Sequence, residues 1–245
     1  MSTISAGSGS RLVLASVVLL GLAACQTSPP VAQPPPPAQP VAESAGIPAG
    51  AREYKIVAED SLLQILVYRG GAMARLGHNH VIASHHLSGS VYVTDDLGQS
   101  RFDVEFPVNE LTIDEPAMRE MAGADFPPGV PQSARDGTRK NLLSEALLDG
   151  ANYPAVRLRA TGVVAAGENF DVDVEITLKD QVHPVRVPMK VDRKDGVVTA
   201  SGEFPLTQSE LGLKPFSAAM GALLVVDEMR VRFEVSTEVG EVGAR

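Results

Sequence analysis

Apolar and polar residues alternate along much of the chain from residue 52 onward. The longest faultless run is Asp171–Lys179, in which apolar side chains occupy Val172, Val174, Ile176 and Leu178. A period of two places such residues on one face of a β-strand and the charged residues between them on the other face. The same period predicts inward faces in four other segments: Phe102, Val104, Phe106 and Val108; Val156, Leu158 and Ala160; Val185, Val187, Met189 and Val191; and Met229, Val231, Phe233 and Val235.

Further strands are predicted between these segments. The runs Tyr54–Val57, Leu62–Tyr68, Leu87–Val93 and Val197–Phe204 are suited to strands, and Lys194-Asp195-Gly196 has the composition of a tight hairpin turn. About eight antiparallel strands, without a long helix between most of them, are typical of a β-barrel or a β-sandwich. The predicted fold class is therefore mainly β.

The segment Glu115–Asp149 breaks the alternation. Its apolar residues recur at intervals of three and four, which is the spacing of a helix face, and Pro127-Pro128 divides it. Each piece is too short to form a stable helix alone. We therefore expect one or two short helices that cover a mouth or a flank of the β-structure.

Residues 1–24 have the features of a bacterial lipoprotein signal peptide. A polar start ends at Arg11, and the apolar run Leu12–Leu20 is too short to span a bilayer as a mature helix. It leads to Leu22-Ala23-Ala24-Cys25, which resembles a lipobox, so Cys25 is the expected lipidation site. An ordinary secretory signal followed by an unrelated cysteine is the alternative, but Cys25 is the single cysteine of the chain.

The composition then changes to a proline-rich tether over residues 25–51, which includes four consecutive prolines. Such a segment cannot form a packed core, and at about 3.1 Å per residue in polyproline geometry it reaches at most roughly 80 Å. Gln26, rather than Asp, after the cysteine indicates the periplasmic side of an outer membrane. The folded domain is expected at residues 52–237, with a C-terminal tail at 238–245.

The chain is acidic, with a formal net charge of −9. Removing residues 1–24, in which Arg11 is the single charged side chain, makes the remainder more acidic still. A nucleic-acid partner would need a basic stripe, and a net acidic surface also argues against electrostatic docking on anionic lipid. One cysteine excludes an internal disulfide and a Cys-rich metal site.

Four of the five histidines lie close together in the sequence, at His78, His80, His85 and His86. If His78 and His80 lie on one strand, they share a face, which suits a common zinc or copper ion. Two or three histidines without a nearby Cys or carboxylate nevertheless form a weak ligand set. The alternative is that Gly77 turns the chain and the imidazoles hydrogen-bond to backbone or to a neighbouring segment.

Three segments resemble those of the YceI-like family, over about residues 54–237. The first runs from Asp136 to Leu143 and continues through Leu147-Leu148-Asp149 to Tyr153-Pro154. The second is Ile176–Val185, with its His183-Pro184-Val185 element, and the third is Ser209–Ser217. The chain departs from the family in two places. It has Arg135-Asp136-Gly137-Thr138 where the family often has Arg-Asp-x-His, and Gly77–His80 resembles a branch of the family.

The resemblance implies an antiparallel, lipocalin-like β-barrel in the periplasm, of a family associated with polyisoprenoid binding. Strand parity adds two polar residues to the interior, because His183 shares parity with Val185 and Asp227 shares parity with Met229. Polar groups of this kind orient the polar head of a mostly apolar ligand. The alternative is that His183 and Asp227 both lie at strand ends, where the mouth of the barrel is open to water. The predicted ligand-binding residues are Phe102, Val104, Phe106, Val172, Val174, Ile176, Leu178, His183, Val185, Val187, Met189 and Asp227.

Two main classes of function follow. In the first, the barrel is a non-enzymatic carrier that binds or sequesters a long isoprenoid or quinone-like lipid. In the second, His78 and His80 bind zinc or copper. A third class is a structural or interaction module whose barrel is filled by its own side chains. The sequence contains no nucleophile elbow, phosphate-binding loop or paired-carboxylate arrangement, so enzymatic activity is not expected.

Overall fold

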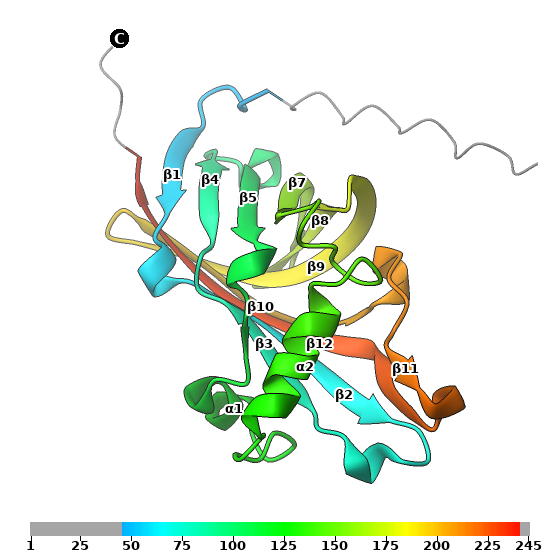
Figure 1. Cartoon of the computed structure of the whole chain (residues 1–245). Helices are drawn as coiled ribbons and strands as arrows, with labels where there is room; N and C mark the ends of the chain where they lie inside the picture. Colours follow the sequence, from blue (N-terminus) through cyan, green and yellow to red (C-terminus); the bar gives the residue numbers. More distant parts are fainter. Residues whose placement is uncertain (1–45, 241–245) are drawn as a thin grey trace, which may run out of the picture. The chain divides into compact units, whose positions relative to one another are not determined.

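The computed structural model describes residues 46–240, which fold into antiparallel strands with two α-helices (Figure 1). In chain order the strands are β1 (Arg52–Ile56), β2 (Leu62–Gly70), β3 (His80–Ser84), β4 (Ser88–Val93), β5 (Arg101–Pro107), β6 (Thr112–Ile113), β7 (Ala155–Ala166), β8 (Asn169–Leu178), β9 (Gln181–Lys194), β10 (Val197–Thr207), β11 (Ser217–Ala218) and β12 (Leu223–Val239). The helices α1 (Pro116–Ala122) and α2 (Gln132–Leu142) lie between β6 and β7.

Eight of the strands close into a ring. Their order is β1-β4-β5-β7-β8-β9-β10-β12, and β12 pairs back with β1, where Tyr54 lies opposite Val239. Every pairing in the ring is antiparallel. This confirms the predicted lipocalin-like barrel.

The long strand β12 joins the ring to a second group of strands. Its last residues pair with β1, whereas the stretch Leu224–Glu234 pairs with β2. Strands β3 and β6 extend the sheet outward from β2. A register shift between Val225 and Met229 marks a bulge in β12. Strand β12 continues to Val239, beyond the predicted domain end at 237.

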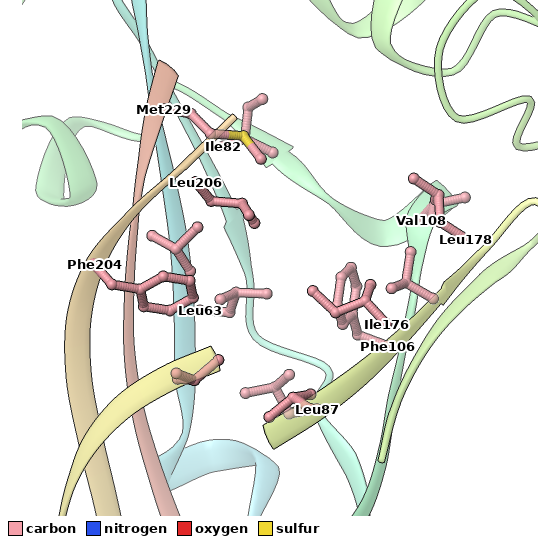
Figure 2. Packing of buried hydrophobic residues seen from close by; sticks show 14 of the residues in the cluster. Leu63, Ile82, Leu87, Phe106, Val108, Ile176, Leu178, Phe204, Leu206 and Met229 are labelled. Carbon is pink, nitrogen blue, oxygen red and sulfur yellow. The ribbon is translucent and has the colours of Figure 1, made fainter. Parts of the chain in front are cut away.

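The inward faces follow the predicted alternation. On β8, Val172, Val174, Ile176 and Leu178 are all buried, and the residues between them are not. Val174 lies opposite Ala160 on β7, so neighbouring strands present their apolar residues to the same side. These side chains belong to the main hydrophobic core of the barrel, part of which Figure 2 shows.

The two helices lie within the predicted segment but are shorter than it. Helix α1 covers a flank, because Met118 packs with Leu66 of β2, Val81 of β3 and Phe126. At the end of α2, Leu142 packs against the barrel core. No helix within residues 46–240 has the length and hydrophobicity needed to cross a bilayer. The predicted signal peptide, Cys25 and most of the tether lie outside the described residues.

Candidate ligand cavity

The barrel contains a cavity of about 500 Å³. Its wall is built mainly from the inward apolar side chains of the ring strands, with additions from β2 and β3. This volume lies within the range of roughly 300–1,000 Å³ that is typical of small-molecule sites. The predicted ligand-binding residues that line the cavity are Phe102, Val104, Phe106, Val172, Val174, Ile176, Leu178, Val187 and Met189.

The register of β7, β8 and β9 explains why these residues meet. Val172 lies opposite Val187, and Phe170 lies opposite Met189, so the β8–β9 hairpin presents one continuous apolar face. The outward residues of the same hairpin include Asp173 and Arg186, which form an exposed ion pair. The sequence therefore separates a charged outer surface from an apolar inner one, strand by strand.

His183 and Val185 do not line this cavity, although their strand does. His183 lies opposite Ile176, so its parity is inward as predicted, but its ring lies beside Gly212. A Cβ atom at Gly212 would be 3.1 Å from His183 Cε1. The His183 Nε2 atom is buried without a hydrogen-bond partner among the described residues. Val185 is only partly buried and packs against the core opposite Val174.

The structure corrects the inward placement of Asp227. Its Oδ1 accepts a hydrogen bond from the Ser209 backbone N–H at 2.9 Å, and its Oδ2 accepts one from Ser209 Oγ at 2.6 Å. Asp227 therefore holds the short 3₁₀ turn η5 (Ser209–Leu211) rather than facing a ligand. The reason is the bulge between Val225 and Met229, which interrupts the period of two that the parity argument assumed.

Several wall residues come from segments outside the predicted set. Strand β2 contributes Leu63, Ile65 and Val67 from one face, but Leu62 and Leu66 on its other face are also apolar, so the sequence of β2 does not alternate. Leucines near the helical segment and after β10 complete the wall in places where no strand period exists: Leu111, Leu142, Leu147, Leu148, Leu211 and Leu213. These leucines follow loop geometry, which the alternation does not predict.

Polar wall residues gather mainly at the end of the barrel near the β4–β5 and β9–β10 turns. Those at this end are Thr94, Asp95, Ser100, Arg101, Arg193 and Thr237, and Gln208 is a further polar residue of the wall. Thr237 Oγ1 donates to the Val198 carbonyl at 2.9 Å, next to Arg193 in the β9–β10 register. The cavity is thus apolar over most of its wall and carries hydroxyl and charged groups at one end.

Three histidines of the sequence cluster have separate side-chain partners: His80 and His85 hydrogen-bond to other elements, and His86 Nδ1 lies 3.4 Å from Glu110. Strand β3 begins at His80, so His78 precedes the strand and the two do not alternate along it. His80 Nδ1 lies 2.5 Å from Asp114 Oδ2, and His80 Nε2 lies 3.1 Å from Thr138 Oγ1. His85 contacts Glu115 at 2.9 Å. Residues 46–240 contain no group of three or more His, Cys, Asp or Glu placed to hold a metal ion, so the zinc or copper site stays a prediction.

Asp114 is the centre of a buried polar cluster on the flank covered by α1. Its fully buried carboxylate accepts hydrogen bonds from Arg119 Nη1 at 2.5 Å and the Val81 backbone N–H at 2.9 Å, besides contacting His80. Desolvation acts to raise the pKa of the Asp114 carboxyl, but the hydrogen bonds from His80, Val81 and Arg119 together hold this pKa below its ordinary value. Asp114 has a left-handed φ of 55°.

Arg119 extends this cluster across the flank. Its guanidinium also donates to the backbone carbonyls of Asn79 and Pro127, and it lies 5.8 Å from the centre of the Phe126 ring. Through Thr138, the cluster also reaches α2. The cluster therefore fastens both helices and the following loop to β3, outside the cavity.

Comparisons with known proteins agree with this geometry. A model described as the YceI-like domain matches residues 54–237. The solved structure of BcnA from Burkholderia cenocepacia is similar, with a TM-score of 0.55 and 14% identity over 74% of this chain and 98% of that chain. A polyisoprenoid binding domain from Saccharophagus degradans, implicated in plant cell wall breakdown, has a TM-score of 0.50 and 14% identity over 76% and 98%. The comparison with curated proteins gave no match.

Proposed function

Since the chain belongs to the YceI-like family, we propose that its barrel binds and sequesters a long apolar ligand without transforming it chemically. The observation that carries this proposal is the cavity of about 500 Å³ inside the closed ring, with an almost wholly apolar wall. Apolar surface that leaves water gains roughly 25 cal/mol per Å², so a hydrocarbon chain is the ligand class that such a wall favours.

The ligand that we propose is a polyisoprenoid or a quinone-like lipid. An amphiphile of this kind has an apolar tail, which matches the wall built by β5, β7 and β8, and a polar head. Thr94, Ser100, Arg101 and Arg193 provide hydroxyl and guanidinium groups at one end of the cavity to orient that head. The Saccharophagus degradans domain, described as polyisoprenoid binding, supports the same ligand class.

The position of the buried Asp114 carboxylate also agrees with a binding role. Asp114 is bound by Arg119 and His80 on the flank, and it is not part of the cavity wall. Its hydrogen bonds join structural elements to one another. We therefore assign this cluster to stability and the cavity to ligand binding.

Replacing Val174 with phenylalanine tests whether the cavity holds a lipid. Val174 is buried and lines the cavity, so the larger ring should occupy ligand space while the protein stays folded. Protein purified from its own membranes should carry lipid detectable by native mass spectrometry, and Val174→Phe should lose most of it with little change in Tm. The control is Val164→Phe on β7, because Val164 is 55% exposed.

A filled barrel would give the opposite result. Forcing a larger side chain into a close-packed interior costs roughly 1–3 kcal/mol. A clear fall in the Tm of Val174→Phe, together with a parent protein that carries no lipid, would contradict the proposed function.

We further propose that Cys25 anchors the protein by lipid to the periplasmic side of the outer membrane, with residues 25–51 as the tether. The support is sequence evidence, namely the apolar run, Leu22–Cys25 and the following Gln26. Cys25→Ser should abolish metabolic labelling with palmitate and leave an uncleaved or soluble precursor, as immunoblots of membrane and soluble fractions would show. Palmitate labelling that persists in Cys25→Ser would refute the anchor.

A further inference from the structure

Two loops lie side by side at one end of the domain and form a surface that we call the tip, defined as residues 69–79 and 212–226. The Met73 backbone N–H donates to the Ala222 carbonyl at 2.7 Å. Gly71 has a φ of +86°, and a Cβ atom there would lie 2.5 Å from the Ala222 carbonyl oxygen, so glycine permits this close approach. Figure 1 shows the two loops together beyond the ends of β2 and β11.

The tip exposes several large apolar side chains. Met220 is fully exposed, and Leu76, Met73 and Phe216 are exposed by 56%, 39% and 37%. Met220 and its neighbour Ala219 have left-handed φ values of 56° and 49°, a conformation that is unfavourable for residues other than glycine. The strained turn therefore keeps an apolar side chain in water, which is costly unless the side chain meets another apolar phase.

The charges of the tip are opposite in sign to those of the whole chain. Arg69, Arg75 and Lys214 are exposed, and residues 69–79 and 212–226 contain no Asp or Glu. The net charge of −9 argued against contact with anionic lipid, but that argument assumed an even distribution of charge. The carboxylates nearest in the sequence, Glu210 and Asp227, flank the second segment and accept hydrogen bonds from Thr207 and Ser209, so the two segments themselves carry only cationic charge.

We propose that the tip docks on a bilayer containing anionic lipids, with Met220, Leu76 and their apolar neighbours inserted at the headgroup boundary. Exposed apolar side chains beside cations, without intervening carboxylates, match the two attractions that hold a protein at such a surface. Leu213 of the tip also lines the cavity, and Leu211, just outside the tip, lines it as well. Docking therefore brings one end of the cavity to the bilayer.

The chemistry of the tip indicates which kind of partner it binds. A protein partner of comparable specificity would need acidic groups paired with these cations, whereas a layer of anionic headgroups over hydrocarbon satisfies both features at once. Docking of the tip does not depend on which ligand the cavity binds. If Cys25 is lipidated, a tether with a reach of roughly 80 Å allows the tip to reach the bilayer that holds the anchor.

The test compares two positions in the full chain on vesicles. Met220→Cys and the matched control Met121→Cys each receive a fluorescent label; both residues are highly exposed methionines, and Met121 lies on α1, outside the tip. The vesicles contain phosphatidylcholine with or without phosphatidylglycerol, together with nitroxide-bearing lipid as a quencher. The parent chain, treated with the same label, gives the background from Cys25. Because the anchor would hold both labelled chains equally, the difference between the positions reports the tip.

We expect several-fold stronger quenching at position 220 than at position 121 on vesicles with phosphatidylglycerol, and a smaller difference without it. One cation near such a surface is worth a factor of about five. Arg75→Glu should therefore lower the ratio of docked to undocked tip at least about fivefold, whereas Lys140→Glu on α2 should leave it unchanged. Equal quenching at positions 220 and 121 on the anionic vesicles would overturn the proposal, and so would equal effects of the two charge reversals.

Discussion

Replacing Asp114 with alanine should lower the free energy of unfolding by about 3–5 kcal/mol, as measured by urea denaturation. The carboxylate is fully buried, and its loss would leave the buried Arg119 guanidinium without its counterion and His80 without its partner. The helix α1 and the loop after it would also lose a main attachment to β3. We therefore expect this flank to unfold before the barrel does.

The matched control is Asp173→Ala. Asp173 also pairs with an arginine, at 2.8 Å from Arg186 Nη2, but both side chains are substantially exposed. Exposed pairs contribute only about 0–1 kcal/mol, because water and salt screen them. Similar losses for Asp114→Ala and Asp173→Ala would show that the flank cluster does not stabilise the fold.

The pH dependence of stability gives a second measurement on Asp114. A carboxyl whose pKa is lowered in the folded protein contributes stability that is fully present above its unfolded pKa and disappears as the pH falls through the folded pKa. The parent should therefore lose this contribution progressively below about pH 4. Asp114→Asn should lack that part of the acid sensitivity.

Replacing Ile176 with aspartate should be at least as damaging, and it should also remove any bound lipid. Ile176 is buried and lines the cavity. A carboxylate there would have no partner on an apolar wall, which costs several kcal/mol and favours the neutral form. The loss, followed by urea denaturation, should therefore become smaller at pH values low enough to protonate the carboxyl.

The neighbouring substitution Thr177→Asp provides the control. Thr177 lies on the outward face of the same strand, opposite Arg157 of β7. A carboxylate at this position meets water and a cation, so we expect a change within about 0.5 kcal/mol. If Ile176→Asp were as well tolerated as Thr177→Asp, the interior of the barrel would have to be wet rather than apolar.

The barrel could be predicted from the sequence because the strands of its hairpins each have one apolar face and one polar face. In β8, polar residues alternate with Val172, Val174, Ile176 and Leu178. This alternation places one face of the strand in the core and the other face in water. Strand β3 could not be predicted from alternation. Its residues Val81–Ala83 are all buried, because α1 covers the face that the barrel does not.

The polar contacts were less predictable than the apolar wall. His80 meets Asp114 and Thr138, which are 34 and 58 residues further along the chain. No local spacing signals such partners, since only the packing of α1 and α2 on β3 brings them together. Asp227 was misplaced for a local reason, because it lies inside the bulge between Val225 and Met229, where the pairing of β12 with β2 is interrupted. The alternation resumes at Met229, which lines the cavity as its parity predicts.

The pairing of β1 with β12 also determines when the barrel can close as the chain folds. The first strand of the ring ends at Ile56, and its partner in β12 ends at Val239. The ring therefore closes only when the two ends of the domain meet. Until then β1 has an open edge, and the apolar faces of the other strands have no closed interior. The chain should therefore fold slowly, as chains with distant strand pairings do.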